Sequence, residues 1–121
     1  NGQNRAFVEH RAQQLGVGHK LRCLRDLHST ALPQRFDSLV CLDVLEHLAD
    51  PSAQLRSFAE RLIPMTGVAL LNWYFFKGFQ GEYPFHFDDS LMVKAFFTTL
   101  QDLFLERFHP HLITARTYTL R

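Results

Sequence analysis

The chain has 121 residues, of which 46% are hydrophobic, and its formal net charge at pH 7 is only +1. A chain of this length forms at most one domain, and its apolar content is sufficient for a packed core. The near-neutral charge gives no indication of a nucleic-acid or membrane partner, and no apolar run reaches membrane-spanning length.

The two cysteines, Cys23 and Cys41, both fall in apolar, strand-like runs. Isolated thiols of this kind are typical of a reducing compartment and not of a disulfide framework. Because the N-terminus has no signal-peptide pattern, we expect a cytoplasmic protein. The chain begins with Asn1 and not with Met, so we also expect it to be part of a longer protein.

The first part of the chain predicts a helix followed by a short strand. Residues 4–15 place apolar side chains on one face and polar ones on the other, as an amphipathic helix does. The glycines of residues 16–18 are a helix stop. Residues 20–24 then predict a short strand.

Two longer apolar runs predict buried strands with a helix between them. These strands are the first half of residues 36–48 and residues 68–76, which are rich in β-formers. Asp50 can cap the intervening helix, Pro51 suits its first turn, and Pro64 ends it.

The last third of the chain predicts a long loop, a helix and a hairpin. Residues 77–89 are rich in glycine and aromatic residues, and a loop of this length is usually functional. A helix begins at Asp89 or Ser90, and residues 103–108 and 112–120 predict two antiparallel strands. The order of elements predicts an α/β fold whose mostly parallel sheet ends in an antiparallel hairpin.

Acidic and imidazole side chains follow the central strand, where open α/β sheets bind their ligands. The relevant segments are Phe36-Asp37, Asp43-Val44-Leu45-Glu46-His47-Leu48, Asp50-Pro51 and Leu62-Ile63-Pro64-Met65-Thr66-Gly67. This pattern resembles the post-strand motif of class I S-adenosylmethionine-dependent methyltransferases. The resemblance implies a partial Rossmann-like sheet, in which the last strand of the family inserts antiparallel beside the fifth, with S-adenosylmethionine as cofactor.

The resemblance covers only the later part of such a domain. No Gly-x-Gly-x-Gly sequence occurs in the chain. We therefore interpret residues 1–121 as a class I methyltransferase-like domain without its N-terminal Gly-rich strand, turn and helix. We expect that missing portion to be a partner of this chain.

The resemblance also implies a set of cofactor contacts. Asp26 would accept a hydrogen bond from the adenine amino group, with the Leu27 backbone nearby, although a turn or capping role also explains an aspartate there. Cys41, Leu42 and Asp43 would line the methionine end of the cofactor. Strand burial alone explains the apolar members, whereas packing gives no reason for the Asp43 carboxylate.

The acceptor side is predicted from imidazole and aromatic groups. His47 is the candidate base, because imidazole exchanges protons near neutral pH; the alternative is that it only hydrogen-bonds within a helical turn. The resemblance implies that Trp73, Tyr74 and His86 face the acceptor, and an aromatic wall suits a planar or apolar small molecule. Core packing is the alternative for the aromatic residues.

The loop after the second long strand is expected to act as a lid over the acceptor, with Gly78 and Gly81 giving it freedom to move. We expect no metal, because Glu46, His47, His86 and Asp88 do not follow a close ligand spacing.

The function predicted from the resemblance is methyl transfer to a small-molecule acceptor. One alternative is a non-catalytic interaction or scaffold domain that has kept the fold. Another is a different Rossmann-like nucleotide-dependent enzyme, against which the motif of residues 43–48 argues.

Overall fold

The computed structural model describes residues 2–24, 34–112 and 114–121, and the chain divides into two compact units, Asn1–Pro33 and Gln34–Arg121. The first unit holds helix α1 (Gly2–Gln14) and the 3-10 helix η1 (Gly18–Lys20). The helix confirms the one predicted over residues 4–15. The assignment of residues 1–121 to one methyltransferase-like domain stays a prediction.

The strand predicted over residues 20–24 is wrong. Lys20 belongs to η1, and residues 21–24 are not in a strand. The backbone folds back at this point: the Lys20 N–H donates to the Val17 carbonyl at 2.9 Å, and the Leu21 N–H donates to the Gly18 carbonyl at 3.2 Å. The turn therefore uses the N–H groups that a strand would offer to a neighbour.

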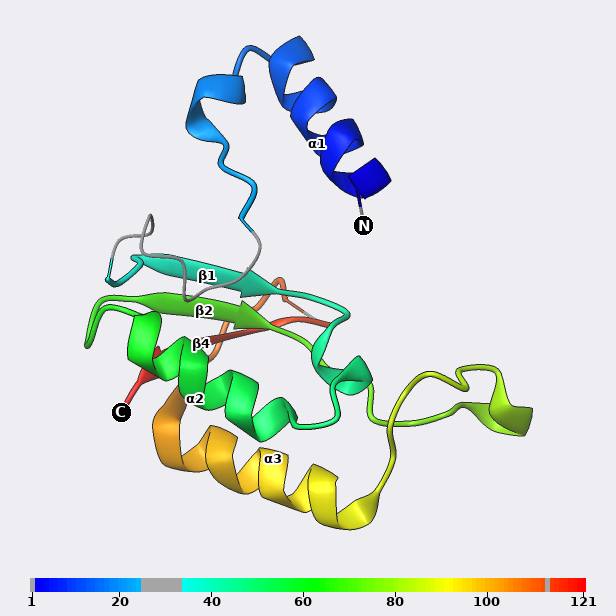
Figure 1. Ribbon diagram of the computed structural model, residues 1–121. Coiled ribbons are helices and arrows are strands. Elements are labelled where there is room, and N and C mark those ends of the chain that lie inside the picture. The colour runs from blue at the N-terminus through cyan, green and yellow to red at the C-terminus, as the bar shows by residue number, and fades with distance from the viewer. Residues whose placement is uncertain (1, 25–33, 113) are drawn as a thin grey trace. The chain divides into compact units, whose positions relative to one another are not determined.

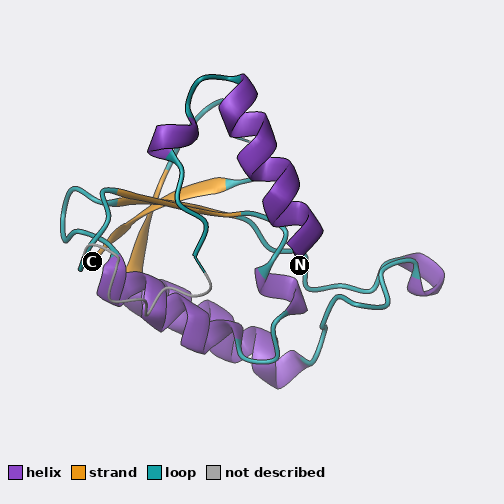
Figure 2. Cartoon of the chain, turned by 45° about the horizontal axis from the view of Figure 1, so that its top comes forward, coloured by secondary structure: helices purple, strands orange, loops and turns teal. Residues whose placement is uncertain are grey.

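The second unit is built around a four-stranded sheet in the order β1-β2-β4-β3 (Figures 1 and 2). The strands are β1 (Ser38–Cys41), β2 (Val68–Leu71), β3 (Phe104–Arg107) and β4 (Arg116–Leu120). This arrangement confirms the α/β class and the terminal hairpin. The last strand, β4, lies antiparallel between β2 and β3.

The described sheet contains both parallel and antiparallel pairs of neighbouring strands. It is therefore only partly parallel, which corrects the expectation of a mostly parallel sheet. β1 and β2 are parallel neighbours, whereas β4 is antiparallel to both β2 and β3. The reason is the place of β4: one reversed strand between two others makes both of its pairs antiparallel.

The strand predicted over residues 68–76 ends early, at Leu71. Both of its ladders stop there, because the last pairs are Cys41 with Leu71 and Leu71 with Arg116. The polar Asn72 follows, and the aromatic residues 73–76 leave the sheet.

Helices α2 (Pro51–Arg61) and α3 (Ser90–Leu103) lie side by side over one face of the sheet (Figure 1). The predicted caps are present: Asp50 accepts from the Ala53 N–H and Asp89 from the Met92 N–H, each at 2.8 Å. Each cap contributes about 1 kcal/mol. The helices and strands of this unit bury a common apolar core, which includes Leu55, Phe58, Ala69, Leu71, Phe96, Leu100, Phe104 and Tyr118.

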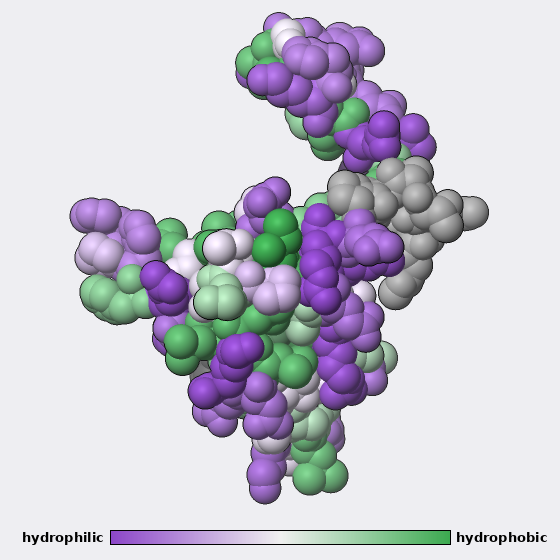
Figure 3. Space-filling model, turned by 90° about the vertical axis from the view of Figure 1, so that its left-hand side faces the viewer, coloured by the Kyte–Doolittle hydropathy of each residue, from purple (hydrophilic) through white to green (hydrophobic). Residues whose placement is uncertain are grey.

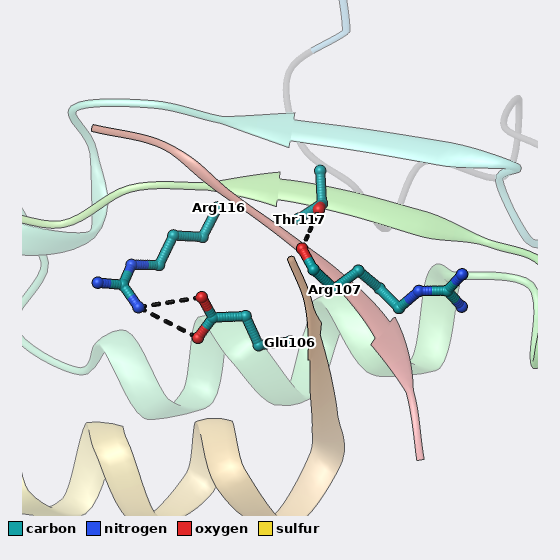
Figure 4. Close-up of polar contacts among 4 residues, drawn as sticks. All are labelled: Glu106, Arg107, Arg116 and Thr117. Atoms are coloured by element: carbon teal, nitrogen blue, oxygen red, sulfur yellow. Dashed lines mark hydrogen bonds and ion pairs between the residues drawn. The ribbon is translucent and has the colours of Figure 1, made fainter. Parts of the chain in front are cut away.

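The terminal hairpin has polar contacts on its exposed side (Figure 4). Arg116 donates to both carboxylate oxygens of Glu106, at 3.0 and 3.2 Å, and the Thr117 hydroxyl donates to the Arg107 carbonyl at 2.7 Å. An exposed ion pair is worth at most about 1 kcal/mol. Burial of Phe104 on β3 is therefore the larger contribution to holding the hairpin in the fold.

Hydrophobic and hydrophilic residues both reach the surface on the face drawn in Figure 3. Large exposed apolar side chains of the molecule include Val40, Met65 and Phe108. Among the described residues, no helix combines the length and the apolar character needed to cross a lipid bilayer.

Candidate active site

The candidate site begins where β1 and β2 end together at the carboxyl edge of the sheet. Asp43 follows β1 with a φ of 54°, and its N–H donates to the Asn72 side-chain oxygen at 2.6 Å. The Asn72 amide in turn donates to an Asp43 carboxylate oxygen at 2.9 Å. This reciprocal pair ties the two strand ends together, and it gives the Asp43 carboxylate a structural reason that the sequence did not reveal.

The short helix η2 (Leu45–His47) comes next and buries a carboxylate. Glu46 is 0% exposed, and neither of its carboxylate oxygens has a hydrogen-bond partner among the described residues. Leu45, also fully buried, anchors this turn in the core. A buried carboxylate without partners is costly, so it is the least expected feature of the site.

The end of the long loop is bonded to η2 through its backbone. The Phe87 N–H donates to the Glu46 carbonyl at 2.9 Å, and Nδ1 of His47 lies 3.0 Å from the Phe85 carbonyl oxygen. Because a carbonyl only accepts, Nδ1 carries the hydrogen and donates it. The remaining nitrogen of His47, Nε2, therefore keeps the lone pair in the neutral ring.

These two bonds bring His86 against the turn. The His47 and His86 rings are edge to face, with centroids 4.7 Å apart. Ligand atoms of Glu46, His47 and His86 all lie within 4.8 Å of one another. Nδ1 of His86 is buried and has no hydrogen-bond partner among the described residues.

A pocket of about 310 Å³ opens beside this cluster. Its walls are mainly aromatic: the Tyr83 ring stacks on His86 at 5.1 Å, and Phe76 meets both rings edge to face. The complete lining is Asp43, Glu46, Tyr74, Phe76, Tyr83 and His86. This size and composition suit a small planar molecule held by a few polar groups.

The loop that carries His86 leaves the carboxyl edge and extends outward (Figure 1). Lys77 and Asp88 join its two ends by an ion pair of 3.2 Å, and the Tyr83 N–H donates to the Lys77 carbonyl at 2.7 Å. Gly78 and Gly81 both have left-handed backbones, with φ of 74° and 76°. The lid role of this loop stays a prediction.

Three of the residues predicted to bind ligands line this one pocket: Asp43, Tyr74 and His86. His47 lies next to it, against His86 and the Phe85 carbonyl, and does not line it. The Trp73 ring lies among Phe96, Phe97 and Tyr118, with centroids 5.5, 5.7 and 6.0 Å away. Packing accounts for that position.

The residues predicted to contact the cofactor lie at the end of β1 or outside the described structure. Cys41 is buried, and burial raises the pKa of its thiol to about 11, with the Glu46 carboxylate as the smaller cause. Leu42 is exposed at the strand end. Asp26 and Leu27 lie outside the described residues.

The sequence did not single out Phe76 as a pocket residue, whereas Tyr83 belongs to the loop predicted to cover the acceptor. Glu46 was predicted only as part of the motif over residues 43–48. No local pattern indicates the burial of Glu46, because it depends on the bonds between residues 85–87 and η2. The positions of Phe76 and Tyr83 depend on the path of the loop, which no local pattern gives.

Comparison with known proteins finds a short similarity to an enzyme. Over 37 residues the chain is 43% identical to the Ubiquinone biosynthesis O-methyltransferase of Proteus mirabilis (strain HI4320). The match covers 31% of this chain and 15% of the length of that enzyme. No family model and no solved structure matches the chain significantly. The similarity gives weak support to a methyltransferase relationship.

Proposed function

We propose that the chain forms the acceptor side of an S-adenosylmethionine-dependent methyltransferase with a Rossmann-like sheet. The observation that carries the proposal is the aromatic pocket at the carboxyl edge of β1 and β2, which is where open α/β sheets bind ligands. The short similarity to an O-methyltransferase supports it. The acceptor is a planar small molecule with a hydroxyl group.

The reaction requires mainly positioning. S-adenosylmethionine would supply an electrophilic methyl group. Its transfer to a lone pair of the acceptor oxygen would leave the carbon–sulfur electron pair on sulfur, as a neutral thioether, and the hydroxyl proton would pass to His47. In-line alignment at near-attack distance supplies most of the acceleration. In this proposal Leu42 and Asp43 meet the methionine end of the cofactor and Tyr74 meets the acceptor.

The remaining roles follow the same proposal. Cys41 supports the strand end from within the core, and Asp26 and Leu27 hold the adenine. His47 has a lone pair on Nε2, which suits a proton acceptor, and it contacts the pocket through His86. The proposed location is the cytoplasm, and the free thiols of Cys23 and Cys41 support it, because such thiols are typical of a reducing compartment.

The test is methyl transfer by the full-length gene product. With S-adenosylmethionine and a panel of phenols and catechols, we expect release of S-adenosylhomocysteine. His86→Ala should lower turnover by roughly 10²-fold, because the proton acceptor His47 contacts the pocket through this ring, and should leave cofactor affinity within about twofold. His109→Ala is the matched control, because His109 lies on the exposed turn of the hairpin.

Two outcomes would contradict this assignment. Wild-type turnover and acceptor affinity in His86→Ala would remove the histidine from the acceptor site. Cofactor binding without turnover on any acceptor would favour the scaffold alternative over an enzyme.

A further inference from the structure

We propose that Glu46, His47 and His86 bind a divalent transition-metal cation of the zinc class beside the aromatic pocket. Their spacing in the sequence gave no reason to expect a metal. The fold supplies that reason, because the end of the loop, residues 85–87, brings His86 to the turn that carries Glu46 and His47.

The strongest observation is the Glu46 carboxylate. It is 0% exposed, and both oxygens are without hydrogen-bond partners among the described residues. Buried charges in proteins are normally paired or coordinate a metal. Within the described part of the chain, the ion pairs of lysine and arginine involve other carboxylates and not Glu46. A bound cation would supply the missing partner.

His47 is already oriented as a metal ligand. Its Nδ1 donates to the Phe85 carbonyl, which fixes the ring and leaves the Nε2 lone pair for coordination. Metal-binding histidines almost always hold their other ring nitrogen in such a bond to a carbonyl or carboxylate. This second observation is independent of Glu46.

His86 supplies the third donor. Its Nδ1 is buried and unpaired among the described residues, so this nitrogen also lacks a partner. One ligand atom from each of Glu46, His47 and His86 lies within 4.8 Å of the other two. Bonds of about 2.1 Å in tetrahedral geometry bring donors to about 3.4 Å, so a pair at the full 4.8 Å must close by about 1.4 Å. The proposal assigns this shift to the loop that carries His86 and contains Gly78 and Gly81.

The donor set selects the class of cation. Two imidazoles and one carboxylate suit Zn²⁺, Co²⁺, Mn²⁺ or Fe²⁺, whereas Mg²⁺ prefers oxygen ligands and retained waters. Three protein ligands leave a position open, as in catalytic zinc sites. Because Glu46 and His86 also line the pocket, the proposal puts the open position on the side of the space where an acceptor would bind.

The role of this cation site in catalysis rests on the proposed function. The acceptor oxygen would occupy the open position of the cation, and the positive charge would lower the pKa of the acceptor hydroxyl group. His47 would then act as a ligand, and the proton would leave to water. Binding of the cation itself does not depend on methyl transfer.

The experiment measures metal binding by the 121-residue chain without cofactor or acceptor. After treatment with chelator, the chain is titrated calorimetrically with Zn²⁺ and spectroscopically with Co²⁺. We expect one equivalent to bind and to raise the melting temperature. Glu46→Gln and His86→Gln should each weaken binding by at least roughly 100-fold, since even outer-shell changes cost 10–100-fold. His109→Gln is the matched control and should bind as wild type.

Glu46→Gln also separates ligation from loss of structure. Its metal-free melting temperature should equal or exceed that of wild type, because the change removes a buried charge without changing shape. The proposal is overturned if Glu46→Gln binds Co²⁺ as wild type does, or if none of these cations binds at micromolar concentration. Binding of Mg²⁺ alone would overturn the assigned class.

The two proposals fail separately. Metal binding without methyl transfer by the full-length gene product would leave the cation site standing and remove the proposed function. If the protein binds none of these cations and its methyl transfer is unchanged by chelator, the proposed function would stand and the cation site would be removed.

Discussion

At the scale of single residues, Asp43 combines two demands in one position. Its left-handed backbone, with a φ of 54°, turns the chain out of β1, and its carboxylate accepts from Asn72 on the neighbouring strand end. Aspartate tolerates this conformation better than most residues do. The same residue lines the pocket, so its structural role and its proposed cofactor role are not exclusive.

Substitutions at Asp43 should separate backbone strain from the side-chain bond. Asp43→Gly and Asp43→Ala both remove the acceptor for the Asn72 amide, but only alanine strains the left-handed backbone. We expect Asp43→Ala to be the less stable by about 1 kcal/mol, the reverse of the usual order for these two residues. Urea unfolding of both variants in the presence of chelator would measure the difference. Equal stabilities would mean that the turn relaxes when the carboxylate is removed.

At the scale of elements, the sequence predicted what depends on local pattern. The caps at Asp50 and Asp89, both helices of the second unit and the terminal hairpin were predictable, because apolar periodicity and capping residues specify them directly. The strand over 68–76 was predicted too long, because its end is set by where the β1 and β4 ladders stop. Sequence alone does not give that register.

The loop over residues 77–89 offers a matched pair of glycines. Both are left-handed, but a Cβ on Gly78 would lie 2.6 Å from the Tyr83 ring, whereas one on Gly81 would meet nothing within 4 Å. Gly78→Ala and Gly81→Ala should each cost about 1 kcal/mol from the backbone. Only Gly78→Ala should also displace Tyr83 from His86, seen as a change in tyrosine near-ultraviolet dichroism. The same spectrum in both variants would show that Tyr83 does not depend on Gly78.

At the scale of the whole molecule, the candidate site is a product of topology. The pocket joins the end of β1, the turn of η2 and a loop that returns after β2. The motif over residues 43–48 pointed to the edge of the sheet where this pocket lies, because parallel strands carry their ligands at their carboxyl ends. It could not indicate that Glu46 would be buried or that His86 would reach it, since both depend on the backbone bonds between residues 85–87 and η2.

The same topology leads to a prediction for cofactor binding by the 121-residue chain itself. The resemblance assigns the carboxypropyl end of the cofactor to a Gly-rich turn and the ribose to a carboxylate on an earlier strand, and this chain has no Gly-x-Gly-x-Gly sequence. At the strand edge, Asp43 already shares one carboxylate oxygen with Asn72. Most of the cofactor contacts that the resemblance implies are therefore not available from these residues. We expect calorimetry of the 121-residue chain with S-adenosylhomocysteine to show no saturation at micromolar concentrations. A micromolar dissociation constant for the 121-residue chain would mean that the cofactor site lies wholly within it, and the contacts assigned to Leu42 and Asp43 would have to be placed again.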